Sequence, residues 1–197
     1  MKNNIELQNV SKKYQGFELR NISFNVLEGC IVGLIGENGA GKTTTIKCIL
    51  NTVNSEGQIK LLGKDSKQNE KEIKEQIGVV LDDSFLSEYL TAKQISSIMK
   101  DLYKTWDENK YNEYIKQFNL PTNKLIKEFS SGMKMKLKIA TAISHSPKLM
   151  ILDEPTSGLD PVVRNEILDI FRKYIEEDET RSILLSTHIT TDLEHIS

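Results

Sequence analysis

The sequence predicts an α/β fold with a parallel sheet at its core, an N-terminal antiparallel β subdomain and an inserted α-helical subdomain. Three observations support this prediction. Residues 5–10 and 17–26 alternate apolar and polar side chains, which is typical of half-buried antiparallel strands. Residues 30–35 form a continuous apolar run, as expected for a buried parallel strand. From about residue 84 to 146 the periodicity is helical, and no strand signal returns until Leu149.

The elements between the apolar run and the helical segment alternate in type. We expect a helix over about 43–51 and a short strand bounded by glycines over 57–63. A charged helix over about 69–76 and a strand over 77–81 follow. This alternation of helices and strands is typical of an α/β core.

The inserted segment and the chain after it are predicted from the same signals. Helical periodicity covers 91–103, 108–118 and 131–144, and prolines separate the elements. A strand begins at Leu149, a helix runs from Pro161 to about residue 174, and a second apolar strand covers 182–186. Trp106, between two of the inserted helices, is predicted to lie in the core.

Composition indicates one water-soluble domain spanning residues 1–197. With 197 residues and 38% hydrophobic content, the chain can bury one core. Its net charge of −2, with both signs interspersed, gives no argument for binding of nucleic acid or of an anionic membrane surface. No apolar run approaches the roughly 18 residues of a membrane span, and the polar start is no signal peptide. Any work at a membrane is therefore expected to require a partner.

Two further residue types are interpreted as structural. Cys30 and Cys48 have no metal-site spacing and are too few for a disulfide scaffold, so we expect small buried apolar side chains in a reducing cytosol. Lys134, Lys136 and Lys138 are interpreted as a solvated helix face, because no basic excess surrounds them.

The residues after the apolar run fit the G-x-x-x-x-G-K-[ST] pattern of a phosphate-binding loop. The loop consists of Gly36, Glu37, Asn38, Gly39, Ala40, Gly41, Lys42, Thr43 and Thr44. Its glycines let successive N–H groups point at phosphate oxygens, and the following helix N-terminus favours negative charge. Lys42 is expected to reach the β- and γ-phosphates, and Thr43 to ligate Mg²⁺. A glycine-rich turn is the alternative, but the flanking strand and helix favour a P-loop NTPase core.

A second candidate site begins where the apolar strand at 149–153 ends in two acids. In phosphate-loop enzymes the first acid holds Mg²⁺, which assigns that role to Asp153. Glu154 is then placed to deprotonate the attacking water as a general base. The alternative, a strand that ends in solvated acids, is weakened by the phosphate loop. Asp160 is a candidate helix cap before Pro161.

His188 follows the strand at 182–186. A lone histidine is usually structural. In an open α/β fold, however, ligands bind outside the carboxyl ends of the parallel strands, where the phosphate loop and the two acids also lie. This position favours a functional role for His188.

These motifs and their order resemble the ATP-binding subunit of an ABC transporter, from Ile5 to the end of the chain. The segment Phe129–Met133 lies where that family has its Leu-Ser-Gly-Gly-Gln signature, Ser157–Asp160 matches its dimer loop and His188 its switch histidine. Tyr14, by itself a half-exposed loop aromatic, lies where the family has an aromatic that stacks on adenine. The run after the signature and the end of the chain look like small single-domain subunits of bacterial ABC-2-type exporters.

The resemblance implies an ATPase with ATP and Mg²⁺ as cofactors. Two such subunits, identical or paralogous, would clamp two ATP molecules head to tail. Ser130 and Gly132 of one subunit would face the γ-phosphate held by the other, helped by the roughly half-charge dipole at a helix start. Glu154, His188 and Lys42 would be the catalytic residues. The partner would be a transmembrane permease, which places the subunit on the inner face of the cell membrane; no nucleic acid is expected.

The sequence departs from the family pattern at three places. Asp82 stands where the family has a glutamine, and we expect its carboxylate to keep a contact with Mg²⁺. Ser131 and Met133 replace a glycine and the glutamine of the signature. Family members continue with further strands and a helix after the histidine, so we expect the C-terminal end of the usual domain to be missing beyond Ser197.

Two alternatives to an exporter ATPase remain. A soluble ABC-type ATPase could act in translation or DNA repair, although the paired domains or long coiled coils of those proteins are not seen in this sequence. A nucleotide kinase or GTPase would not explain the signature, dimer loop and histidine together, and the sequence has no Asn-Lys-x-Asp guanine motif.

Overall fold

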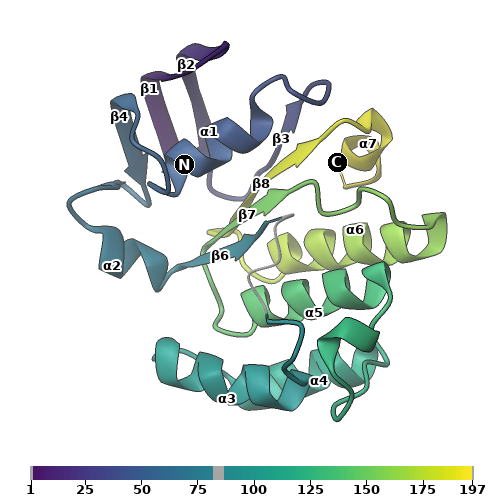
Figure 1. Ribbon diagram of the computed structural model, residues 1–197. Helices are drawn as coiled ribbons and strands as arrows, with labels where there is room; N and C mark the ends of the chain where they lie inside the picture. The colour runs from purple at the N-terminus through teal and green to yellow at the C-terminus, as the bar shows by residue number, and fades with distance from the viewer. Residues whose placement is uncertain (1, 82–86, 197) are drawn as a thin grey trace.

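The computed structural model describes residues 2–81 and 87–196, and two four-stranded sheets organise them (Figure 1). The first sheet is antiparallel, with strand order β2-β1-β4-β5. The second is parallel, with order β3-β8-β7-β6. The predicted α/β fold class is confirmed. In Figure 1, α1 lies above the parallel sheet, whereas α5 and α6 lie below it.

The antiparallel sheet forms from the segments that alternate apolar and polar residues. It contains β1 (Asn3–Tyr14), β2 (Phe17–Leu27), β4 (Glu56–Leu61) and β5 (Lys64–Asp65). Tyr14 pairs with Phe17 across a two-residue turn, in which Gly16 takes a φ of +86° that glycine adopts readily. The single strand predicted over 57–63 is in fact β4 followed by a turn and the short β5, because Leu62 and Gly63 both have positive φ.

The parallel sheet contains β3 (Ile31–Ile35), β6 (Ile77–Val80), β7 (Leu149–Asp153) and β8 (Ser182–Thr187). Every residue of β7 and β8 is buried, as the apolar runs predicted. The run at 30–35 is parallel as expected but only half-buried, and Ile35 is 55% exposed. The reason is its place at one end of the strand order, next to β8 alone.

The two faces of the parallel sheet belong to two different apolar clusters. Leu149 and Ile151 of β7 join α1 and the antiparallel sheet, whereas Met150 and Leu152 join the helices on the other face. This division follows from the two-residue period of a strand. Cys48 is buried in the first cluster, as predicted, while Cys30 is half-buried.

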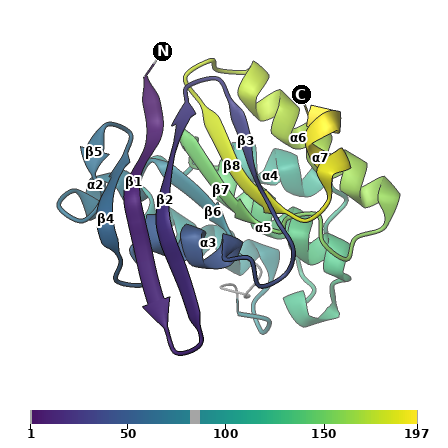
Figure 2. The same ribbon diagram turned by 90° about the horizontal axis from the view of Figure 1, so that it is seen from above.

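The remaining helices flank the sheets. They are α1 (Lys42–Ile49), α2 (Glu70–Lys74), α6 (Pro161–Glu176) and α7 (Thr190–Ile196). Asp160 caps α6 as predicted: its carboxylate accepts from the amides of Val162 and Val163, each at 3.1 Å. The sequence analysis predicted no element after His188, so α7 is an addition. Figure 2 shows α6 and α7 side by side.

A helical segment stands between β6 and β7, as predicted. It contains α3 (Ala92–Leu102), α4 (Glu108–Gln117), a 3-10 turn at Ile126–Glu128 and α5 (Ser131–Ile143). Thr91 and Gln94 form a capping box at the start of α3, in which each side chain accepts from the backbone amide of the other residue. Two N–H groups that lack a partner within the helix are thereby satisfied. Trp106, predicted as a core residue, is half-buried: its ring centroid lies 5.2 Å from that of Tyr111.

The interpretation of the three α5 lysines as a solvated face is wrong. Lys138 is only 8% exposed and donates to the carbonyl of Leu81 at 3.0 Å. Lys136 pairs with Glu166 of α6, and its side chain is 15% exposed. The reason is that α5 is covered by β6 on one side and approached by α6 on another, which the charge pattern does not reveal. None of the described helices is both long and apolar enough to span a bilayer.

A buried histidine follows α5 at the end of the helical segment. His145 is 2% exposed, and its ring stacks on Tyr103 with centroids 4.0 Å apart. Burial lowers the pKa of His145 from 6.5 to about 4, because the charged imidazolium would lose its hydration. The folded protein therefore holds this ring neutral in a pH range where the unfolded chain protonates it.

We predict that His145 makes the fold sensitive to mild acid. Below the unfolded pKa of 6.5 the unfolded state binds a proton that the folded state refuses, so the free energy of unfolding falls as pH decreases towards 4. Between pH 6.5 and about pH 5 the loss should be about 1–2 kcal/mol. The variant His145→Phe keeps an aromatic ring against Tyr103 and should lose this share of the pH dependence in urea unfolding. His195→Gln, at the surface, is the control; equal pH dependence in parent and His145→Phe would contradict the prediction.

Candidate functional site

The phosphate loop joins β3 to α1 and has the backbone shape that its glycines allow. Gly39 and Gly41 take φ values of +87° and +98°, which side chains disfavour. A Cβ at Gly36 would lie 3.1 Å from that of Ala40, so the loop closes tightly on itself. The amide of Ala40 donates to the carbonyl of Glu37 at 3.1 Å, which holds the curve. The predicted strand, loop and helix are all present.

Lys42 folds back across this loop. Its ammonium donates to the carbonyls of Gly36 at 2.6 Å and Glu37 at 3.2 Å. The same nitrogen lies 3.0 Å from Oε1 of Glu154, and the lysine side chain is 9% exposed. The loop and the end of β7 are thus joined by one ion pair at low exposure, where charge interactions are stronger than at the surface.

The two acids lie at the carboxyl end of β7, beside the end of β8. Asp153 is 2% exposed and pairs in register with Ser186. The Ser186 hydroxyl donates to Oδ1 of Asp153 at 2.6 Å and accepts from the amide of Glu154 at 2.9 Å. Ser186 therefore fixes both acids. The sequence analysis missed this residue; a hydroxyl near the end of an apolar strand, two residues before His188, was the available signal.

Glu154 lies between two cationic or proton-donating groups. Its Oε2 is 2.8 Å from Nδ1 of His188, and its Oε1 faces Lys42. An ionised carboxylate only accepts hydrogen bonds, so Nδ1 of His188 carries the proton in this contact. Oε1 is buried and has no directed hydrogen bond from any described residue, which makes the contact with Lys42 an ion pair alone.

A cleft of about 650 Å³ opens over these groups. Its lining residues come from the hairpin, the phosphate loop and the end of β7: Phe17, Asn38, Gly39, Gly41, Lys42, Thr43, Thr44, Glu154 and Ser157. Phe17 and Ser157 were not predicted as site residues. The cleft suits a magnesium-bound triphosphate: the glycines leave room for phosphate, Lys42 supplies positive charge, and Oε1 of Glu154 is a buried acceptor in need of a donor. Thr43 and Asp153 carry oxygen atoms of the kind Mg²⁺ prefers.

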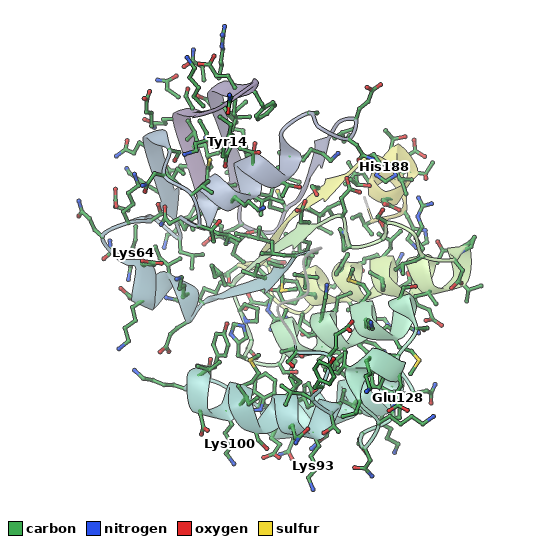
Figure 3. All side chains as sticks on the ribbon, viewed as in Figure 1. Tyr14, Lys64, Lys93, Lys100, Glu128 and His188 are labelled. Atoms are coloured by element: carbon green, nitrogen blue, oxygen red, sulfur yellow. The ribbon has the colours of Figure 1, made fainter. Side chains whose placement is uncertain are left out.

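The other predicted site residues lie elsewhere. Figure 3 shows Tyr14 over the N-terminal sheet and His188 beside the end of β8. Tyr14 is 40% exposed, with the Lys12 ammonium 5.1 Å from its ring centroid, and it does not line the cleft. Ser130 caps α5 by accepting from the amide of Met133 at 3.2 Å. A Cβ at Gly132 would lie 3.1 Å from Val163, so α5 packs closely on α6 there.

No described part of α5 lines the cleft, so the structure does not bring Ser130 or Gly132 to the phosphate loop of their own chain. Asp82, the expected metal contact, lies outside the described residues.

Comparisons with known proteins agree with this geometry. The family model described as "ABC transporter" matches residues 19–157. The bacitracin transport ATP-binding protein BcrA of Bacillus licheniformis is 36% identical over 178 residues, 89% of this chain and 58% of that protein. The ABC transporter ATP-binding protein YtrB of Bacillus subtilis (strain 168) is 32% identical over 194 residues, 98% of this chain and 66% of that protein.

A solved structure titled "Structure of ATP binding subunit of ABC transporter" has the same fold, with a TM-score of 0.85 and 30% identity. The match covers 98% of this chain and 82% of the solved one. Against the two curated relatives, the chain spans 58% and 66% of their length.

We predict that Ser186 contributes substantially to stability. The variant Ser186→Ala would leave Oδ1 of Asp153 and the amide of Glu154 without their common partner, and burial prevents water from replacing it freely. The free energy of unfolding should fall by about 1–3 kcal/mol. Ser144→Ala is the matched control, because that buried hydroxyl donates only to a helix carbonyl, of Ala140. Urea unfolding of both variants tests this, and equal small losses would contradict it.

Proposed function

Since this chain belongs to the ATP-binding subunits of ABC transporters, we propose that it binds and hydrolyses ATP to power export through a separate membrane subunit. The observation that carries this proposal is the position of Glu154 between Lys42 of the phosphate loop and His188. A base, a cation and a second proton donor within contact distance at one cleft suit phosphoryl transfer to water.

The loop and α1 would bind the triphosphate. Backbone N–H groups of the loop and the start of α1 would face the phosphates, and Lys42 would exchange its contact with Glu154 for phosphate oxygens. Thr43 and Asp153 would hold Mg²⁺, which when bound supplies positive charge to neutralise the phosphates. Asp82 is proposed as a further metal contact. Tyr14 is proposed to stack on the adenine, with Phe17 as the aromatic side chain nearest the phosphate loop.

The chemical step would depend on Glu154. When Lys42 turns to a phosphate, Oε1 loses its ion pair and becomes free to accept a proton from the attacking water. His188 would keep Oε2 in place through its Nδ1–H bond. The burial of Oε1 and its lack of a directed hydrogen bond support this role, because once Lys42 leaves, the oxygen is an acceptor without a donor.

The active assembly is proposed to be a head-to-tail pair of ATP-binding subunits, identical or paralogous. Ser130 and Gly132 at the start of α5 would face the γ-phosphate held by the second subunit. Their distance from the cleft of their own chain supports this role, because no described residue of α5 lines it.

We propose one nucleotide-binding domain over residues 1–197, with an inserted helical subdomain at about 84–146. The permease partner would place it on the inner face of the cell membrane. The relatives' names, one of which is a bacitracin transport ATP-binding protein, support a role in transport. Export of the ABC-2 type is the direction and class that we propose. The transported substrate is left open by this proposal.

We predict that Glu154→Gln retains ATP binding but slows hydrolysis by about 10²-fold or more, because the amide cannot accept the proton from water. Lys42→Ala should instead lose ATP binding, since the loop then lacks its cation. ATP binding by equilibrium titration and phosphate release measured on the same preparations separate the two effects. Hydrolysis by Glu154→Gln at the parent rate would show that Glu154 is not the base.

The proposed partner is tested by copurification. A tagged chain expressed with its genomic neighbours should retain a multi-span membrane protein through detergent extraction, and binding of that protein should persist in Glu154→Gln. Recovery of ribosomal or DNA-repair proteins in place of a membrane protein would contradict the export role.

A further inference from the structure

We propose that Asp192 is a positioning residue for hydrolysis. Its buried carboxylate holds the chain segment that carries Glu154 and the segment that carries His188 in the relative position at which those side chains meet. Asp192 lies on α7, is fully buried and has no place in the chemistry described above. This inference rests on the proposed function.

One oxygen of Asp192 joins the two segments. Oδ2 accepts from the hydroxyl of Thr156 at 2.7 Å and from that of Thr187 at 3.1 Å. Thr156 comes two residues after Glu154, and Thr187 comes immediately before His188. A movement of either segment would break a buried hydrogen bond to this carboxylate, which costs more than breaking one at the surface because water cannot replace it freely.

The other oxygen anchors this junction to α6. Oδ1 of Asp192 accepts from Nε of Arg164 at 2.5 Å, and the guanidinium also donates to Thr191 at 2.7 Å. Arg164 lies in the first turns of α6, which begins just after the proposed dimer loop. Asp160 caps the start of α6 and so fixes the helix that carries Arg164. The guanidinium of Arg164 therefore holds the carboxylate of Asp192 from a fixed position.

The helix that carries Asp192 also contacts the strand ahead of the phosphate loop. A Cβ at Gly33 of β3 would lie 2.4 Å from a methyl group of Leu193, so the glycine lets α7 approach β3 closely. A single short helix is therefore in contact with the strand that leads into the phosphate loop and with the segments that carry Glu154 and His188.

A purely structural link between α6 and α7 is present nearby and serves for comparison. Asp169 on α6 lies 3.3 Å from Nε2 of His195 on α7, and its side chain is 45% exposed. This contact joins the same two helices but does not touch the segments that carry Glu154 and His188. Asp169→Asn is therefore the matched control for Asp192→Asn.

The first test needs no nucleotide. The chain has three histidines, so long-range ¹H–¹⁵N spectra of the imidazoles can be assigned with single variants. The neutral form of His188 should show the Nδ1–H tautomer in the parent, because Glu154 accepts from Nδ1. Asp192→Asn should shift His188 to a tautomer mixture like that of Glu154→Ala, whereas Asp169→Asn should leave it unchanged.

The second test measures hydrolysis. Asp192→Asn should lower kcat by about tenfold or more while the ATP dissociation constant changes by less than about threefold, because the carboxylate does not touch the cleft. In a His188→Ala background, Asp192→Asn should lower kcat only slightly further, because the contact between Glu154 and His188 that Asp192 supports is already absent. If Asp192→Asn does not fold, Thr156→Val and Thr187→Val remove one hydroxyl each and should show the same pattern, more weakly.

The outcomes separate this inference from the proposed function. If the parent chain with its partner hydrolyses no ATP, the proposed function fails. If the parent hydrolyses ATP but the Asp192 or threonine variants leave the His188 spectrum and kcat unchanged, the positioning role alone is overturned. The positioning role is also overturned if the kcat losses of Asp192→Asn and His188→Ala add fully in the double variant. It is likewise overturned if Asp169→Asn also lowers kcat, in proportion to its loss of unfolding free energy.

Discussion

The site depends on one carboxylate, that of Glu154, which meets Lys42 on one oxygen and His188 on the other. Glu154 and His188 directly follow β7 and β8, and Lys42 begins α1 after the loop that follows β3; the three strands belong to one parallel sheet. Parallel strands bring their carboxyl ends to one edge, so groups more than a hundred residues apart in the chain meet there. The register sets the meeting point: Ile35 pairs with Thr187, and Asp153 with Ser186.

The last two residues of β8 bind carboxylates on both faces of the parallel sheet. Successive side chains of a strand point to opposite faces, so Ser186 and Thr187 reach different partners. Ser186 donates to Asp153, the proposed metal ligand, and Thr187 donates to Asp192. Two buried carboxylates therefore accept hydrogen bonds from adjacent hydroxyls of one strand, and a shift of β8 by one residue would take both hydroxyls away from them. Burial of such groups without partners is costly, which makes the register at the site strongly determined.

The sequence predicted those parts of the fold and site that have a local signal. The phosphate loop, the acids after β7 and the apolar strands could be identified because spacing and periodicity are properties of short segments. Lys138 was misjudged because its burial depends on what covers α5, whereas Trp106 packs against the core as predicted but is only partly buried. The partners of Asp153 and Asp192 could not be predicted, since Ser186, Thr156 and Arg164 acquire their roles only when α6, β7 and β8 pack together. The helix α7 is short and is held in place by its own side chains: Leu193 packs against β3, and the carboxylate of Asp192 accepts buried hydrogen bonds.

Local strain and an unsatisfied acceptor coincide at Glu154, and together they indicate a site prepared for a ligand. The residue has a φ of +49°, a backbone region that non-glycine residues seldom occupy. Its Oε1 is buried without a directed hydrogen bond and has only the ion pair with Lys42. By contrast, Oδ1 of Asp153 accepts from Ser186, and both oxygens of Asp192 accept hydrogen bonds. The fold thus gives the carboxylate of Asp192 hydrogen bonds on both oxygens, but holds the one oxygen that we propose accepts a proton from water by an ion pair that a ligand can replace. This is the distribution expected where stability is sacrificed for function.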